Sequence, residues 1–197
     1  MCCMRIAAPI LLALAFAGAA GPASAQLVAP PPARLDSPAP LHPGDAFGEP
    51  VTLPAGTIIY LMGHSNWDAA FDTLVDSFKS LGEYLDKQGI KPTGAAMTIY
   101  TQTDDKGFSF KAAMPIAAAP PNPPKGDIAV GPAPTGKALK FVHRGSYDAM
   151  DSTYEAITNY LDDKHLEATD LFIEEYVTDP VKTDPDSLVV NVFVPVK

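Results

Sequence analysis

Cysteine is scarce in this chain. The only two, Cys2 and Cys3, lie ahead of an apolar run at residues 6–17. A lipidation signal needs its cysteine after such a run, so we expect no lipid anchor. If the first residues are removed by processing, the mature chain contains no cysteine and can form no disulfide.

A long hydrophobic run is also missing. The run at residues 6–17 is too short and too alanine-rich to span a bilayer comfortably. Arg5 precedes it, and Ala23-Ser24-Ala25 follows it as a cleavage site. Residues 1–25 are therefore typical of a signal peptide. We expect a periplasmic or secreted protein with no stable membrane insertion after cleavage; a retained anchor is the alternative.

Basic charge is in deficit. The chain has 14 Lys and Arg against 23 Asp and Glu, for a formal net charge of -9, and no basic stripe. Nucleic-acid phosphates and anionic lipids both require clustered positive charge, so neither is an expected partner. An acidic surface of this kind favours solubility and attracts cations weakly.

Several chemical motifs are absent. The chain has no phosphate-binding loop, no dinucleotide fingerprint and no G-x-S-x-G nucleophile elbow. Its histidines show no metal-ligand spacing with one another or with cysteine. They are His42, His64, His143 and His165. The sequence thus predicts no metal and no cofactor.

Proline and glycine gather in two places. Residues 26–50 are rich in Pro and Ala, which predicts a disordered tether. Residues 117–132 are rich in Pro and Gly, which predicts a linker. Between and after them, residues 51–116 and 133–197 show the same order of signals. The sequence therefore predicts one domain, residues 51–197, built from two repeats.

Each repeat predicts a strand, a short polar turn, an amphipathic helix and a closing hairpin. The turns are expected at 63–66 and 143–146, and the helices at about 67–88 and 147–165. Four matches in order support duplication: Trp67-Asp68-Ala69 with Tyr147-Asp148-Ala149, Tyr84-Leu85-Asp86 with Tyr160-Leu161-Asp162, Tyr100 with Tyr176, and Met114-Pro115-Ile116 with Val194-Pro195-Val196.

The duplication predicts an α+β fold. One helix cannot cover a three-stranded sheet, so a single repeat would leave apolar surface in water. Two strand-helix-strand-strand repeats can instead form one largely antiparallel sheet that carries two helices. A groove between the repeats is the expected ligand site.

Glu174 and Tyr176 are two residues apart on a predicted strand, so they share a face with Phe172. A buried carboxylate beside aromatic rings would have a raised pKa or need a cation. That makes Glu174 a candidate ligand-facing acid. The alternative is that both Glu174 and Glu175 are solvated at a sheet edge.

The run from Phe141 to Tyr147, followed by Glu174-x-Tyr176 and the strand 192–196, resembles the GyrI-like small-molecule-binding domain. That domain is also the effector-binding half of multidrug-responsive transcription activators. The resemblance covers about residues 51–197, more closely in the second repeat. No helix-turn-helix segment accompanies it here.

The resemblance implies a cleft that holds a partly aromatic, neutral or cationic ligand, with Glu174 as the polar anchor. The candidate ligand-binding residues are Glu174, Tyr176, Tyr100, Trp67, Tyr147 and Phe193. Thr98 occupies the position in the first repeat that matches Glu174. Some relatives hydrolyse cyclopropane-containing toxins, so catalysis by Glu174 with Tyr176 or Tyr100 is the alternative. A haem-binding protein and a structural envelope protein are further alternatives.

Overall fold

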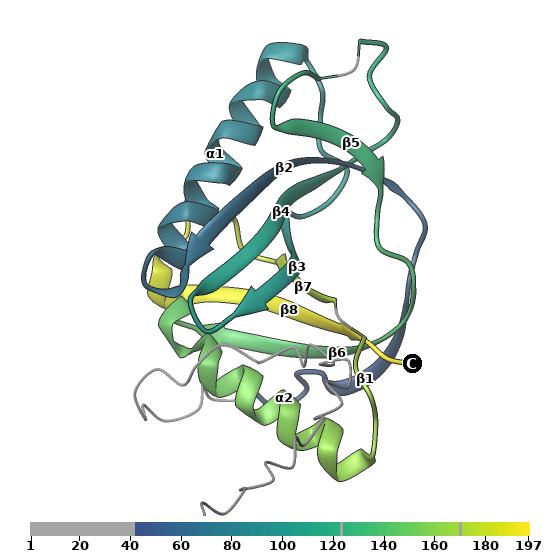
Figure 1. The fold of residues 1–197 in the computed structure, drawn as a ribbon, viewed down its shortest axis with the longest axis vertical. Helices are drawn as coiled ribbons and strands as arrows, with labels where there is room; N and C mark the ends of the chain where they lie inside the picture. The colour runs from purple at the N-terminus through teal and green to yellow at the C-terminus, as the bar shows by residue number, and fades with distance from the viewer. Residues whose placement is uncertain (1–41, 123, 170) are drawn as a thin grey trace, which may run out of the picture.

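The computed structural model describes residues 42–197, apart from residues 123 and 170. One antiparallel sheet of eight strands carries two helices on the same side (Figure 1), as the α+β prediction required. The strands are β1 (Phe47–Leu53), β2 (Thr57–Asn66), β3 (Met97–Asp104), β4 (Gly107–Ile116), β5 (Ile128–Pro132), β6 (Gly136–Gly145), β7 (Phe172–Tyr176) and β8 (Leu188–Pro195). The helices are α1 (Ala70–Gln88) and α2 (Met150–Lys164).

The strand order is β1-β6-β8-β7-β3-β4-β2-β5. Strands β3 and β7, one from each repeat, pair at the centre. At the edges the repeats exchange strands: β1 of the first repeat pairs with β6, and β5 of the second pairs with β2. Each repeat thus contains one strand more than the predicted strand-helix-strand-strand unit.

Strand β1 corrects the predicted boundary of the tether at residue 50. The ring of Phe47 contacts those of Phe141 and Tyr160, with centroids 5.1 and 5.7 Å apart. This tertiary packing orders a proline-containing segment, and the edge position tolerates Pro50 because one side of the strand needs no backbone donor. Residues 26–41 of the expected tether, and the whole signal peptide, lie outside the described residues.

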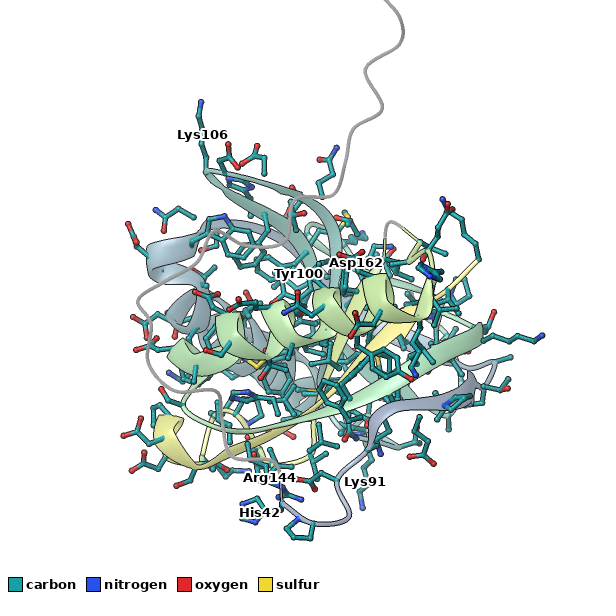
Figure 2. The ribbon with its side chains drawn as sticks, turned by 90° about the horizontal axis from the view of Figure 1, so that it is seen from below. His42, Lys91, Tyr100, Lys106, Arg144 and Asp162 are labelled. Atoms are coloured by element: carbon teal, nitrogen blue, oxygen red, sulfur yellow. The ribbon has the colours of Figure 1, made fainter. Side chains whose placement is uncertain are left out.

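The segment before β1 is held by an ion pair. Arg144 donates to both carboxylate oxygens of Asp45 at 2.8 Å. The same carboxylate accepts from the backbone N–H of His42 at 3.1 Å, and Figure 2 shows His42 and Arg144 side by side. The predicted linker is likewise shorter than 117–132, because residues 128–132 form β5 against β2.

The polar turns predicted at 63–66 and 143–146 are wrong. Strands β2 and β6 continue to Asn66 and Gly145. Short 3-10 turns, η1 (Trp67–Ala69) and η2 (Tyr147–Ala149), then lead into the helices. Asn66 and Ser146 cap these turns by accepting backbone N–H bonds at 2.9 and 3.3 Å.

The helices end as expected. Gly89 terminates α1 with φ of 66°, and His165 terminates α2 with φ of 53°. A third 3-10 turn, η3 (Pro185–Ser187), precedes β8. No helix in the described part of the chain is both long and apolar enough to cross a membrane.

The main hydrophobic core fills the space between the helices and the sheet. From α1 and α2 it takes one apolar face each, which includes Leu74, Phe78, Tyr154, Ile157 and Leu161. A second cluster, which includes Ile58, Ile99 and Ile173, lies on the opposite face of the sheet. This division decides which strand residues can meet side chains from the helices.

Candidate functional site

Strand β7 sends its two glutamates to opposite faces. Glu174 is fully buried on the helix side, together with Tyr176. Glu175 is partly exposed on the other side, where it accepts a hydrogen bond from the Asn191 amide at 2.7 Å. The acid singled out from the sequence is therefore in the interior and not at a solvated edge.

Two tyrosines bind the Glu174 carboxylate. The Tyr154 hydroxyl, from α2, donates to Oε1 at 2.7 Å. The Tyr176 hydroxyl donates to Oε2 at 2.8 Å. None of the ion pairs in the described part of the chain involves Glu174. The carboxylate is thus satisfied by neutral donors and lacks a cation.

Two more tyrosines close the site from the side where the helices begin. The hydroxyls of Tyr100 and Tyr147 are 3.1 Å apart. The Tyr147 ring stacks on Phe71 of α1, with centroids 4.9 Å apart. Tyr100 itself is buried in the main core. Glu174, which the sequence analysis places in an inter-repeat groove, is thus fully buried among aromatic side chains.

Burial raises the pKa of Glu174 above its ordinary value of 4.5. The hydrogen bonds from Tyr154 and Tyr176, and the nearby Tyr100 hydroxyl, oppose this shift. Hydrogen bonds to a charged group contribute about 1.5–3 kcal/mol each. Burying a carboxylate without a cation costs several kcal/mol even after relaxation.

The tyrosines respond to the same environment. Burial, and next the charge of Glu174, raises the pKa values of Tyr100, Tyr147, Tyr154 and Tyr176 well above 10. Their hydroxyls are therefore protonated at neutral pH and act as hydrogen-bond donors. A ring of neutral donors around one acid suits the binding of a polar or cationic group, because it stabilises the ionised carboxylate.

His143 holds the turn that carries Tyr147. Its Nε2 lies 3.0 Å from the Ser146 carbonyl, which can only accept, so Nε2 carries the proton. Nδ1 then accepts from the Thr153 hydroxyl at 2.8 Å. Burial lowers the pKa of His143, which keeps the ring neutral in this arrangement. In the first repeat, Ser65 and Thr73 make the corresponding bond between β2 and α1 at 3.0 Å.

Four of the six candidate residues come together: Glu174, Tyr176, Tyr100 and Tyr147. Trp67 lies at the margin, where its ring packs on Phe108 and its Nε1 donates to the Asp104 carbonyl at 2.8 Å. Phe193 lies on the opposite face of the sheet, packed against the second cluster. The structure therefore separates Phe193 from Glu174.

Tyr154 was missing from the candidates because its helical spacing fits an ordinary core position. The signal that could have found it is the hydroxyl. A tyrosine on the buried face of a helix usually finds a hydrogen-bond partner, and Glu174 is the acid that the sequence analysis expects to be buried. In the described residues, no group of three or more His, Cys, Asp or Glu could hold a metal ion.

Together the fold and the site define a duplicated α+β ligand-binding domain, and solved structures share this architecture. The C-terminal domain of EcmrR aligns with a TM-score of 0.64 and 16% identity, over 76% of this chain and 96% of that one. In the complex of EcmrR with DNA, the TM-score is again 0.64 at 17% identity, and this chain covers only 56% of the EcmrR chain.

Two further structures are similar. SAV2435, solved bound to tetraphenylphosphonium, gives a TM-score of 0.52 at 15% identity, over 76% of this chain and 93% of that one. A hydrolase from Listeria innocua gives a TM-score of 0.51 at 12% identity, over 76% of this chain and 91% of that one. At these identities the likeness is one of fold. A search of curated proteins finds no match.

The model of the GyrI-like small-molecule-binding domain matches residues 49–197, so the chain belongs to that family. The resemblance drawn from the sequence is therefore confirmed. Small-molecule binding is the coarse function that membership supports, and a small molecule is the corresponding partner.

Proposed function

We propose that this protein is an exported binding protein that holds a partly aromatic cation, or a neutral relative of one, between its two repeats. Glu174 is the polar anchor. The observation that carries the proposal is a fully buried carboxylate whose hydrogen-bond partners among the described residues are neutral hydroxyls. An organic cation would supply the missing charge, and the surrounding tyrosines would supply aromatic faces.

A ligand can reach Glu174 only if side chains around it move. Both oxygens of Glu174 already accept hydrogen bonds, and Tyr100 and Tyr147 close the approach between the beginnings of the two helices. The Tyr147 ring is partly exposed and rests on Phe71. We infer that a ligand enters by displacing this stacked pair, so binding exchanges aromatic contacts within the protein for contacts with the ligand.

The experiment is calorimetric titration with tetraphenylphosphonium, a compound bound by the similar protein SAV2435. Glu174→Gln keeps the size of the side chain and removes its charge. Glu175→Gln makes the same change on the neighbouring residue, which faces the other side of the sheet. We expect binding to the wild type and to Glu175→Gln, and at least about tenfold weaker binding to Glu174→Gln.

Equal affinity in all three proteins would overturn the role of Glu174. If no organic cation bound, a structural envelope protein would be favoured instead. A Soret band after addition of haem would favour a haem-binding protein. The proposed export is tested separately, by the N-terminal sequence of protein recovered from the periplasm. A chain that starts at Gln26 supports it.

Hydrolysis of a reactive small molecule is the second candidate, because Glu174 lies within hydrogen-bond distance of a tyrosine hydroxyl. Glu174 would act as general base on a water, and Tyr176 or Tyr100 would donate to the leaving oxygen. The Listeria hydrolase supplies the analogy, which is one of fold. Turnover of a cyclopropane-containing substrate, lost in Glu174→Gln while the fold persists, would favour this reading.

A further inference from the structure

Thr98 and Glu174 face each other at the point where the two repeats meet. Strands β3 and β7 pair antiparallel, with Thr98 directly opposite Glu174. The repeat alignment that matches Tyr100 to Tyr176 also matches Thr98 to Glu174. Each of these two residues is therefore paired with its own counterpart, and the pseudo-twofold axis passes between them.

Both side chains point to the helix face, and both residues are fully buried. Directly opposed residues in an antiparallel pair have Cβ atoms about 4.5–5.5 Å apart. A carboxyl on each side of the axis would form a like-charge pair, and one of the two would remain protonated. Threonine on one side leaves a single acid in this pair on the axis.

The Thr98 hydroxyl supports that acid indirectly. It lies 3.4 Å from the Tyr176 hydroxyl. Because the Tyr176 proton is donated to Glu174, the Thr98 hydroxyl must be the donor in this contact. Thr98, Tyr176 and Glu174 thus form a hydrogen-bonded chain that ends on one carboxylate, and position 98 supplies no carboxylate on the first-repeat side.

We propose that Thr98 sets the charge of the ligand, so that the site takes organic cations with one positive charge and rejects rigid dications. This rests on the proposed function, because it concerns the same site. A monocation neutralises Glu174. A second positive charge on a rigid ligand would be buried without a partner, at a cost that its attraction to the distant acid does not offset.

The probes are N-methyl-4-phenylpyridinium and methyl viologen. Both are biaryl cations of nearly equal shape, and they differ by one positive charge. Calorimetric titration gives the ratio of their affinities for each protein. We expect the wild type to prefer the monocation by about tenfold or more, because the second charge of methyl viologen would be taken out of water without a carboxylate partner.

Three variants separate charge from shape. Thr98→Glu places a second acid on the axis and is expected to move the ratio toward the dication by about tenfold. Thr98→Gln introduces a side chain of the same size as that in Thr98→Glu but without its charge, and it is expected to keep the wild-type ratio. The exchange Thr98→Glu with Glu174→Thr moves the single acid across the axis and is also expected to keep the preference for the monocation.

A folded Thr98→Glu with an unchanged ratio would overturn the proposal while leaving the binding function intact. If circular dichroism shows that Thr98→Glu does not fold, the wild type decides, because equal affinity for the two probes refutes the charge limit. Wild-type protein that binds neither probe nor tetraphenylphosphonium would refute the proposed function, and this inference with it.

Discussion

Glu174→Gln should stabilise the protein increasingly as pH rises. Burial raises the pKa of Glu174 above 4.5. Below that pH the group is protonated in both the folded and the unfolded chain, so its burial carries no charge penalty. Above it the unfolded chain releases the proton first, and the free energy of unfolding of the wild type falls until the folded-state pKa is passed. Glutamine carries no titratable proton, so the free energy of unfolding of Glu174→Gln does not fall in this way.

The size of the effect follows from proton linkage. A single group that holds its proton only in the folded state lowers the free energy of unfolding by up to about 1.4 kcal/mol per pH unit. Each pH unit between 4.5 and the folded-state pKa therefore adds up to that amount to the difference between the two proteins. The tyrosine hydrogen bonds limit how far the folded-state pKa is raised, and the difference between the two proteins stops growing once the pH exceeds that pKa.

Urea unfolding of the wild type and of Glu174→Gln at pH 4, 5, 6, 7 and 8 measures the difference. Other groups whose pKa values shift on folding, such as Asp45 and His143, are common to both proteins and cancel. The expected result is a difference that grows from about pH 4.5 upward and then levels. A difference that is constant from pH 4 to 8 would refute the claim that burial penalises this carboxylate.

Three further changes test a hydrogen bond, a close contact and an ion pair of the fold. Tyr154→Phe removes a donor to the buried carboxylate and should cost about 1–3 kcal/mol in urea unfolding; an equal loss from Tyr84→Phe, at a partly exposed site, would contradict this. Gly63→Ala would place a Cβ in steric conflict with the Phe110 ring and should cost about 1–3 kcal/mol; Phe110→Leu in the same chain should recover part of this loss, and no recovery would argue against the clash. Asp45, whose arginine partner lowers its pKa from 3.8 to about 2, stabilises the fold above that range, so Asp45→Asn should lower Tm at pH 6 and less as pH falls toward 2; a constant deficit would refute the linkage.

The duplication could be predicted because helical and strand periodicities survive in both repeats. The edge strands could not. In β1, Gly48 and Pro50 oppose strand formation, and the strand forms because Phe47 finds Phe141 and Tyr160 across the fold. Strand β5 is short and adjoins a proline-rich segment, so its pairing with β2 has no local signal. Both strands depend on tertiary contacts that the sequence pattern does not contain.

The site was predictable where alternation fixed the direction of a side chain. The spacing of Glu174 and Tyr176 placed them on one face, and the structure places both on the helix face. For Phe193 the sequence left both faces open, because β8 is apolar on each side. Only the pairing of Phe193 with Ile173 shows that it faces away from Glu174.

The exchange of edge strands between the repeats constrains how the chain folds as it is synthesised. Strand β1 leaves the ribosome early, yet its only partner in the sheet is β6 of the second repeat. Pairing over such a separation must wait for that partner and for the closure of a long loop. A nascent chain that stops before Gly136 therefore lacks the strand that orders Phe47–Leu53, and protease should cut this segment until β6 has emerged.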